Sequence, residues 1–117
     1  MVNTGEDIVH QSLEATFARG YTPFVASEEK SEKPVSIVGA GSSLANTYKD
    51  IVGDIMTCNS AHDFLIGKGI IPKYAMIWDA NPIMGEMIKT PHNDVHYLIA
   101  SRCHPSVFEK LNGYRVS

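Results

Sequence analysis

VSIVGAGSSL, residues 35–44, runs from a β-branched apolar segment through two glycines into a segment of helical composition. The apolar part, Val35 to Gly39, is typical of a buried strand, and Ser42 or Ser43 can cap the helix that follows. Glycines permit positive φ and close approach of a ligand, and the first amides of a helix are unpaired, so this turn favours an anion. A tight turn without a ligand is the alternative, because Leu44 replaces the third glycine of the dinucleotide fingerprint.

Further along the chain, short apolar runs bounded by turn residues predict three more strands, at residues 54–58, 74–79 and 95–100. Segments of helical composition lie around them, at residues 43–52, 61–68, 82–89 and 105–111. Residues 114–116 would begin a fifth strand. Alternation of this kind implies right-handed crossovers. We therefore expect an α/β fold with a Rossmann-like parallel sheet of four to five strands and flanking helices on both faces.

The order of the strands sets the surroundings of the glycine-containing turn. We expect Val35 to Gly39 to be central and buried, with the strands that end at Cys58 and Ala100 on its two sides. A sheet of four or five strands also leaves an unpaired edge and apolar surface. We therefore expect a homo-oligomer that covers them.

Before the sheet, the sequence predicts an amphipathic helix at residues 5–19, with Thr4 as a possible cap and Gly20 as the stop. Its apolar side chains recur at every fourth position: Val9, Leu13 and Phe17. A helix with this pattern is expected to pack its apolar stripe on the rest of the protein.

The segment that follows the helix, residues 26–34, is rich in charge and ends in proline, which is typical of an exposed loop. We therefore divide the chain into two parts. Residues 1–33 form the helix and its connector. Residues 34–117 form a Rossmann-like nucleotide-binding half-domain, which we expect to be incomplete at its C-terminal end.

Composition excludes several classes of function. With 117 residues, a net charge of -3 and no basic stripe, the chain is a poor match for a nucleic-acid partner. Its apolar runs are too short to span a membrane and the N-terminus has no secretory pattern, so we expect a cytoplasmic protein. Cys58 and Cys103 form no CxxC pair, which argues against a zinc site and a disulfide framework.

Polar residues also follow the other predicted strands, where ligands of open parallel sheets bind. Asn59 and Ser60 can bond a ribose or base, and Asp79 is a carboxylate at a strand end. Ser101, Arg102 and His104 would flank the first strand from its other side. The predicted catalytic residues are Asp79 and His104. The predicted nucleotide-binding residues are Gly39, Ala40, Gly41, Ser42, Ser43, Leu44, Asn59, Ser60 and Ser101; no metal ligand is predicted.

Some of these residues have a structural alternative. Asn59 and Asp79 are common helix caps. His104, directly before Pro105, is a common loop pair, and Arg102 is equally consistent with a solvated surface residue. The sequence alone therefore leaves their role open.

The order of these motifs resembles the MptE-like 6-hydroxymethylpterin diphosphokinase family, which includes the Maf flagellin glycosyltransferases. The resemblance covers residues 34–117 and rests on SIVGAGSSL, TCNSA and LIGKGIIPKYAMIWDANP. The family's first motif is G-x-G-P-S-L, which Gly39, Gly41, Ser43 and Leu44 match while Ser42 replaces the proline. A similar motif occurs in bacterial sialyltransferases, which bind a cytidine nucleotide sugar. Family members are longer, so the resemblance implies a truncated or partial member.

Two classes of function follow from these observations. The first is a nucleotide-dependent transferase, a diphosphokinase or a glycosyltransferase, that binds ATP or a nucleotide sugar such as a CMP-sugar and in which a role for Mg²⁺ is left open. The second is a nucleotide-binding or assembly module without catalysis. An NAD-dependent oxidoreductase is a weaker third reading, because Cys58 and Asn59 replace the acidic ribose ligand. In each case the expected partner is a small-molecule nucleotide.

Overall fold

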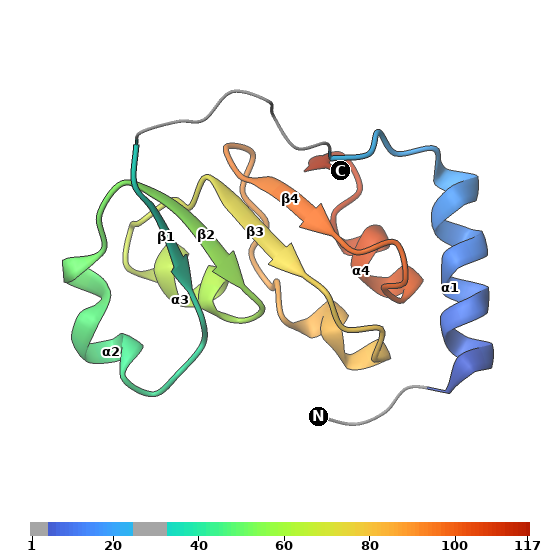
Figure 1. Ribbon diagram of the computed structural model, residues 1–117, viewed down its shortest axis with the longest axis horizontal. Helices are drawn as coiled ribbons and strands as arrows, with labels where there is room; N and C mark the ends of the chain where they lie inside the picture. Colours follow the sequence, from blue (N-terminus) through green and yellow to red (C-terminus); the bar gives the residue numbers. More distant parts are fainter. Residues whose placement is uncertain (1–4, 25–32) are drawn as a thin grey trace.

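The computed structural model describes residues 5–24 and 33–117, and the order of its elements is shown in Figure 1. The elements are α1 (Glu6–Arg19), β1 (Val35–Val38), α2 (Leu44–Thr47), η1 (Tyr48–Asp50), β2 (Asp54–Cys58), α3 (Ala61–Gly67), β3 (Tyr74–Ile77), η2 (Pro82–Glu86), β4 (His96–Ile99), α4 (Pro105–Lys110) and β5 (Arg115–Val116), where η denotes a 3-10 helix.

The five strands form one sheet in which every neighbouring pair is parallel. The predicted α/β class, the Rossmann-like parallel sheet and the N-terminal helix are therefore confirmed. The short fifth strand is also present, although it contains only Arg115 and Val116. The predicted helices at residues 43–52 and 82–89 are shorter than expected, because each contains a 3-10 turn in place of a longer α-helix.

The predicted position of the first strand is wrong. The order in the sheet is β1-β2-β3-β4-β5, so β1 lies at an edge and has β2 as its only neighbour among the described strands. The strand that ends near Ala100 is β4, which lies between β3 and β5. The alternation of strands and helices fixes the handedness of each crossover but not the direction in which the crossover steps along the sheet. Consequently Ile37 in β1 is 71% exposed.

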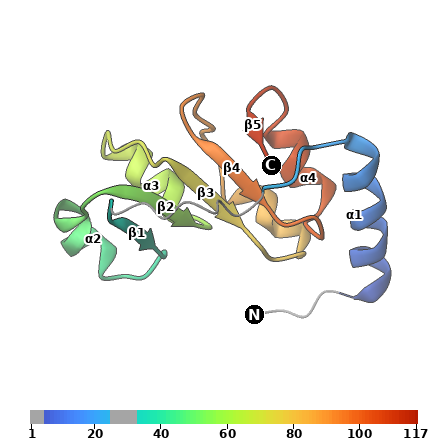
Figure 2. The same ribbon diagram turned by 45° about the horizontal axis from the view of Figure 1, so that its top comes forward.

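The expectation that helices cover both faces is also wrong. Figure 2 shows α3 and α4 on the same side of the sheet. Successive right-handed crossovers that step in one direction place all their helices on one face. Side chains on that face are buried, including those of Thr57, Ala75, Ile77 and Tyr97. The opposite face, hereafter the open face, carries Met56, Met76 and Leu98.

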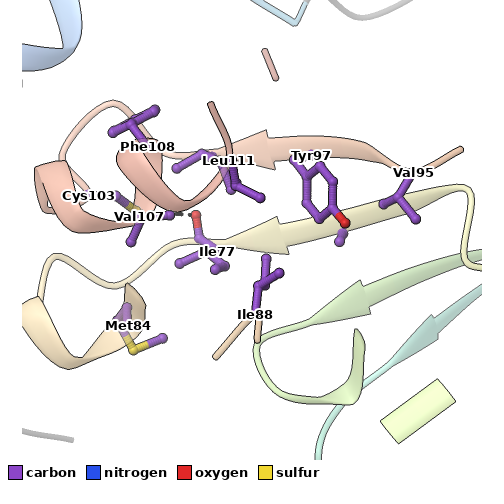
Figure 3. Close-up of a cluster of buried hydrophobic side chains, with 11 residues drawn as sticks. Ile77, Met84, Ile88, Val95, Tyr97, Cys103, Val107, Phe108 and Leu111 are labelled. Atoms are coloured by element: carbon purple, nitrogen blue, oxygen red, sulfur yellow. Dashed lines mark hydrogen bonds between the residues drawn. The ribbon is translucent and has the colours of Figure 1, made fainter. Parts of the chain in front are cut away.

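The larger of two apolar clusters lies between β3, β4, η2 and α4, and Figure 3 shows it in close-up. Phe108, Val107 and Leu111 come from the segment of α4 and pack over Ile77 and Tyr97 of the sheet. Gly85 lets η2 approach α4 closely, since a Cβ at this position would lie 2.8 Å from Ser106 Oγ. The smaller cluster holds α2 and α3 on β1 through Val38, Leu44, Ala61 and Leu65.

Helix α1 spans Glu6–Arg19 and ends at Gly20, whose φ of 70° confirms the predicted stop. The predicted cap, Thr4, lies outside the described residues, as does most of the connector, and Gly5 occupies the cap position. The predicted apolar stripe is buried only in part: Val9 and Leu13 are half-buried, on the same face of the helix as the buried Ser12 and Thr16. Ser12 and Thr16 are buried, and their hydroxyls donate to backbone carbonyls one turn earlier at 2.8 Å. Phe17 is 73% exposed.

A buried polar network joins α3 to the middle of the sheet. His62 Nε2 lies 2.8 Å from the Tyr97 hydroxyl, and His62 Nδ1 lies 2.9 Å from Asp63 Oδ1. The backbone N–H of His92 donates to the same hydroxyl at 2.7 Å. Burial lowers the pKa of His62 below its usual value, although Asp63 opposes this effect, and burial raises the pKa of Tyr97 to about 12. A neutral imidazole that donates to Asp63 and accepts from Tyr97 satisfies every group.

Replacing Tyr97 by Phe should lower the free energy of unfolding by about 1 to 3 kcal/mol, because buried polar groups of His62 and His92 lose their partner. Urea denaturation measures this change. Tyr48→Phe is the matched control, since no hydrogen bond of the Tyr48 hydroxyl occurs in the described part of the chain. Equal loss of stability in both variants would contradict the role given to the network.

The stability of the protein should decrease as the pH falls below about 6.5, the ordinary pKa of histidine. The pKa values of His62 and His96 are both lowered, chiefly by burial, so the unfolded chain binds protons that the folded protein resists. The stabilisation is present above pH 6.5 and is lost as the pH falls through the folded-state values. The midpoint of urea unfolding should therefore be lower at pH 5.5 than at pH 7.5, and His62→Gln should reduce this difference while exposed His10→Gln should not.

Candidate functional site

The turn after β1 is held in place by one buried side chain. Leu44, the first residue of α2, packs with Val38, Ala61 and Leu65, and its N–H donates to Gly41 O at 3.1 Å. Ser43 occupies the predicted cap position of α2, but its side chain forms no capping hydrogen bond. The turn is therefore fixed at its end by Leu44, and Ser43 is exposed and does not line the pocket described next.

The two glycines of this turn do not have the backbone conformation that the sequence suggested. Positive φ among the described glycines occurs at residues 20, 53, 69 and 113, and neither Gly39 nor Gly41 is among them. A Cβ at Gly39 would meet nothing within 4 Å, and a Cβ at Gly41 would meet only Ser43 Oγ at 3.9 Å. Neither backbone strain nor internal packing therefore requires glycine at these two positions.

The same turn forms one wall of a pocket of about 270 Å³. The start of α3 forms the opposite wall. The pocket is lined by Ala40, Gly41, Ser42, Leu44, Ala45, Ser60, Ala61 and Phe64. Five of the predicted nucleotide-binding residues are thus brought together, namely Ala40, Gly41, Ser42, Leu44 and Ser60.

Three lining residues were not predicted from the sequence: Ala45, Ala61 and Phe64. The helical spacing of Ala61 and Phe64 on the segment after Ser60 was the signal that could have found them, because residues three apart share a helix face. Phe64 provides an aromatic wall. Lys68 Nζ lies 5.6 Å from the centre of the Phe64 ring, so a cation flanks the pocket although no charged residue lines it among the described residues.

Three backbone N–H groups of the turn form no hydrogen bond within the described residues. Within residues 33–117, no hydrogen bond uses the backbone N–H of Gly41, Ser42 or Ser43. Ser60 is the cap residue of α3, and its side chain also forms no capping bond. Because α2 has only four residues and α3 has seven, the helix dipoles add little, and binding would depend on individual N–H and O–H donors.

Asn59 has a structural role. Its φ of 54° is the one left-handed value among the described residues other than glycine, and its N–H donates to Met76 O at 3.1 Å. Asparagine tolerates this conformation better than most residues. Asn59 therefore makes the bend from β2 into α3, and it does not line the pocket.

The carboxylate of Asp79 also has an internal partner. Asp79 Oδ1 accepts from the N–H of Asn81 at 2.9 Å, and the Asp79 carbonyl lies 3.5 Å from the Sγ of buried Cys103. The side chain of Asn81 in turn caps η2 by accepting from Ile83 N. Asp79 thus shapes the turn after β3 and does not line the pocket beside β1.

The residues after β4 do not flank β1, contrary to expectation. Figure 1 shows β2 and β3 between β1 and β4, so the loop with Ser101, Arg102 and His104 lies beyond two intervening strands. Ser101 and Arg102 are exposed. His104 caps α4, since its Nδ1 accepts from Ser106 N at 3.2 Å. The predicted catalytic pair therefore does not meet at the pocket, because the sheet order separates the strand ends.

Comparison with known proteins identifies no relative. No family model, no curated protein and no solved structure matches the chain. Among the described residues, no group of three or more histidine, cysteine, aspartate or glutamate side chains could hold a metal ion. None of the described helices is long and apolar enough to cross a membrane.

Replacing Asp79 by Ala should lower the free energy of unfolding by about 1 kcal/mol, because the N–H of Asn81 loses its acceptor. Asp79→Asn should retain most of the stability, since an amide oxygen can accept the same bond. Thermal or urea unfolding of the two variants makes the comparison. If both variants keep full stability, the carboxylate does not serve the turn as described.

Proposed function

We propose that the protein binds the phosphate or ribose part of a nucleotide in the pocket between the turn after β1 and the start of α3. The observation that carries this proposal is the pair of glycines at residues 39 and 41. Neither the backbone nor the packing requires them, and at Gly41 the open space adjoins unpaired N–H groups in the pocket wall. A side chain at this position would fill the space in which a ligand could approach the backbone.

The lining of the pocket supports a nucleotide over a simple anion. N–H and O–H donors of Ser42 and Ser60 suit phosphate or ribose oxygens, and Phe64 offers a flat apolar wall. A pocket of about 270 Å³ is slightly below the size that encloses a drug-sized ligand, which fits part of a nucleotide better than all of it.

We further propose that this binding serves a transferase, a diphosphokinase or a glycosyltransferase, with ATP or a nucleotide sugar such as a CMP-sugar as the donor. The resemblance of residues 34–117 to the MptE-like family supports this assignment. In this proposal Asp79, which lies on the turn after β3, the second strand along the sheet from β1, would orient the acceptor. The cytoplasm is the proposed site of action, consistent with free thiols at both Cys58 and Cys103.

A second candidate is a nucleotide-binding module without catalysis of its own. The observation that favours it is that Asp79 and His104 are both occupied in turns or caps and lie apart from the pocket. An NAD-dependent enzyme is the weakest reading, because β2 ends in Cys58 and offers no carboxylate to a ribose.

The proposed site predicts that Gly41→Val weakens nucleotide binding by more than tenfold. The branched side chain would occupy the approach to several donors, and each hydrogen bond to a charged group contributes about 1.5 to 3 kcal/mol. The measurement is calorimetric titration of the folded protein with ATP, CMP, CDP, UDP and NAD, followed by titration of the variant with the best ligand.

The matched control for this titration is Gly67→Val. Gly67 is also exposed, has an ordinary φ and has nothing within 4 Å of an added Cβ, but it lies outside the pocket. The Gly67→Val protein should bind the best nucleotide with the same affinity as the unmodified protein. Equal affinity of the Gly41→Val protein and the unmodified protein would show that the turn is only structural. If Asp79→Asn leaves the nucleotide affinity unchanged, Asp79 does not take part in binding, and any role it has lies in the chemical step.

A further inference from the structure

One buried histidine attaches the α3 wall of the pocket to the sheet. Ser60, Ala61 and Phe64 line the pocket from the start of this helix. His62 lies between them in sequence and is fully buried, and its Nε2 lies 2.8 Å from the hydroxyl of Tyr97 in β4. Because α3 has only seven residues, a displacement of His62 carries the lining residues with it.

The hydrogen bonds of this attachment require one arrangement of protons. The Tyr97 hydroxyl accepts from the N–H of His92 at 2.7 Å and donates its own proton to Nε2 of His62. The other ring nitrogen of His62 then carries the proton and donates to Asp63 Oδ1 at 2.9 Å. No third partner of the Tyr97 hydroxyl occurs among the described residues. All members are satisfied only when the imidazole is neutral.

A second proton on His62 would break this arrangement at one point. Nε2 would become a donor, so the Tyr97 hydroxyl would accept from both neighbours and its own proton would have no acceptor. The bond to Asp63 would remain, because a charged imidazole donates to a carboxylate more strongly than a neutral one. Protonation therefore weakens the bond between α3 and β4, which holds the pocket wall on the sheet.

The groups around His62 set the pH range of this change. Burial lowers the pKa of His62, Asp63 opposes this effect, and charge on His92 in the loop before β4 adds to it. Tyr97 stays neutral because its pKa is raised to about 12. His62 is therefore neutral at pH 7.5 and takes up a proton only below about pH 6.5. The other neighbours of Tyr97 on this face carry no charge in that range: Ala75 and Thr57 along the sheet, and Tyr114 beside its ring.

We propose that His62 is a proton-sensitive positioning residue of the nucleotide pocket, such that the neutral imidazole holds the α3 wall in place for the ligand and protonation lowers the affinity for nucleotide. The proposal rests on the nucleotide binding proposed above and adds a regulation of the same site. By linkage, bound nucleotide disfavours the protonation of His62 by the same factor. The protein releases its nucleotide as the pH falls.

The first measurement uses the full chain without ligand. NMR spectra recorded from about pH 5 to about pH 8 follow the His62 ring and the backbone amides. The amides of Ser60, Ala61 and Phe64 should shift with the same midpoint as the His62 ring. In His62→Gln these shifts should be absent, because glutamine stays neutral and its oxygen can still accept from Tyr97. Amides that do not titrate, or that follow another histidine, would overturn the proposal.

The second measurement is the affinity for the best nucleotide at pH 7.5 and at pH 5.5. The unmodified protein should lose about threefold or more in affinity beyond the loss seen for His62→Gln. The protonation of the ligand's own phosphate is common to both proteins and cancels in this comparison. If His62→Gln does not fold, the NMR titration of the unmodified protein decides, because bound nucleotide must move the midpoint of the His62 ring to lower pH.

His96→Gln is the matched control for both measurements. His96 is also buried with a lowered pKa, but it bonds to Ser117 and does not line the pocket. This variant should change the pH dependence of stability and leave that of the affinity as in the unmodified protein. If no nucleotide binds at any pH, the proposed function fails and this proposal with it. If Gly41→Val weakens binding but the two histidine variants and the unmodified protein share one pH dependence of affinity, only the role of His62 is overturned.

Discussion

The right-handed parallel crossover is the constraint on which the rest of the structure depends. Each crossover steps the chain in the same direction, so the strands follow one another in sequence order and their connecting helices lie on one face. The carboxyl ends of the strands then line one edge in the order of the chain. For this reason the turn after β1 has only the loop after β2 beside it, and the pocket is built from these two segments.

The buried polar network connects this architecture to the pocket. His62 and Asp63 belong to the first turn of α3, directly after Ser60 and Ala61, which line the pocket. Tyr97 holds His62 from the middle of β4, and Asp63 accepts from the N–H groups of Lys89 and Thr90. One strand, β4, and the loop before it therefore fix the orientation of one pocket wall. The position of Ser60 depends on hydrogen bonds formed more than 25 residues away in sequence.

Much of the fold could be predicted from local sequence patterns. The short apolar runs and their turn residues predicted the strands, and Gly20 predicted the end of α1, because these signals act within a few residues. The order of the strands could not be predicted in this way. It depends on where each crossover lands, and two solutions with the same elements place Val35 to Gly39 at the centre or at the edge.

Only part of the candidate site could be predicted, because the site too depends on the order of the strands. Ala40, Gly41, Ser42, Leu44 and Ser60 lie on two consecutive strand-to-helix turns, which any parallel neighbour arrangement brings together. Ser101 and His104 required the end of β4 to lie beside β1, and the sheet order prevents this. On α1 the periodicity was right in part: Val9 and Leu13 are half-buried, whereas Phe17 is exposed. Ser12 and Thr16 are buried on the same face, which their hydroxyls tolerate because they bond to carbonyls of their own helix.

The two turns at the pocket differ in whether their sequence is required by the backbone conformation. The turn after β2 needs a left-handed residue, and Asn59 provides it with a φ of 54°. The turn after β1 contains two glycines yet uses neither for a left-handed conformation, and space is open around both. A sequence constrained only by folding would gain from a larger residue at such a position, since glycine loses more conformational entropy on folding than other residues do. Gly67 has the same open surroundings and ordinary φ, so openness alone does not distinguish a glycine; Gly41 differs from Gly67 because its open space adjoins the pocket between the two turns.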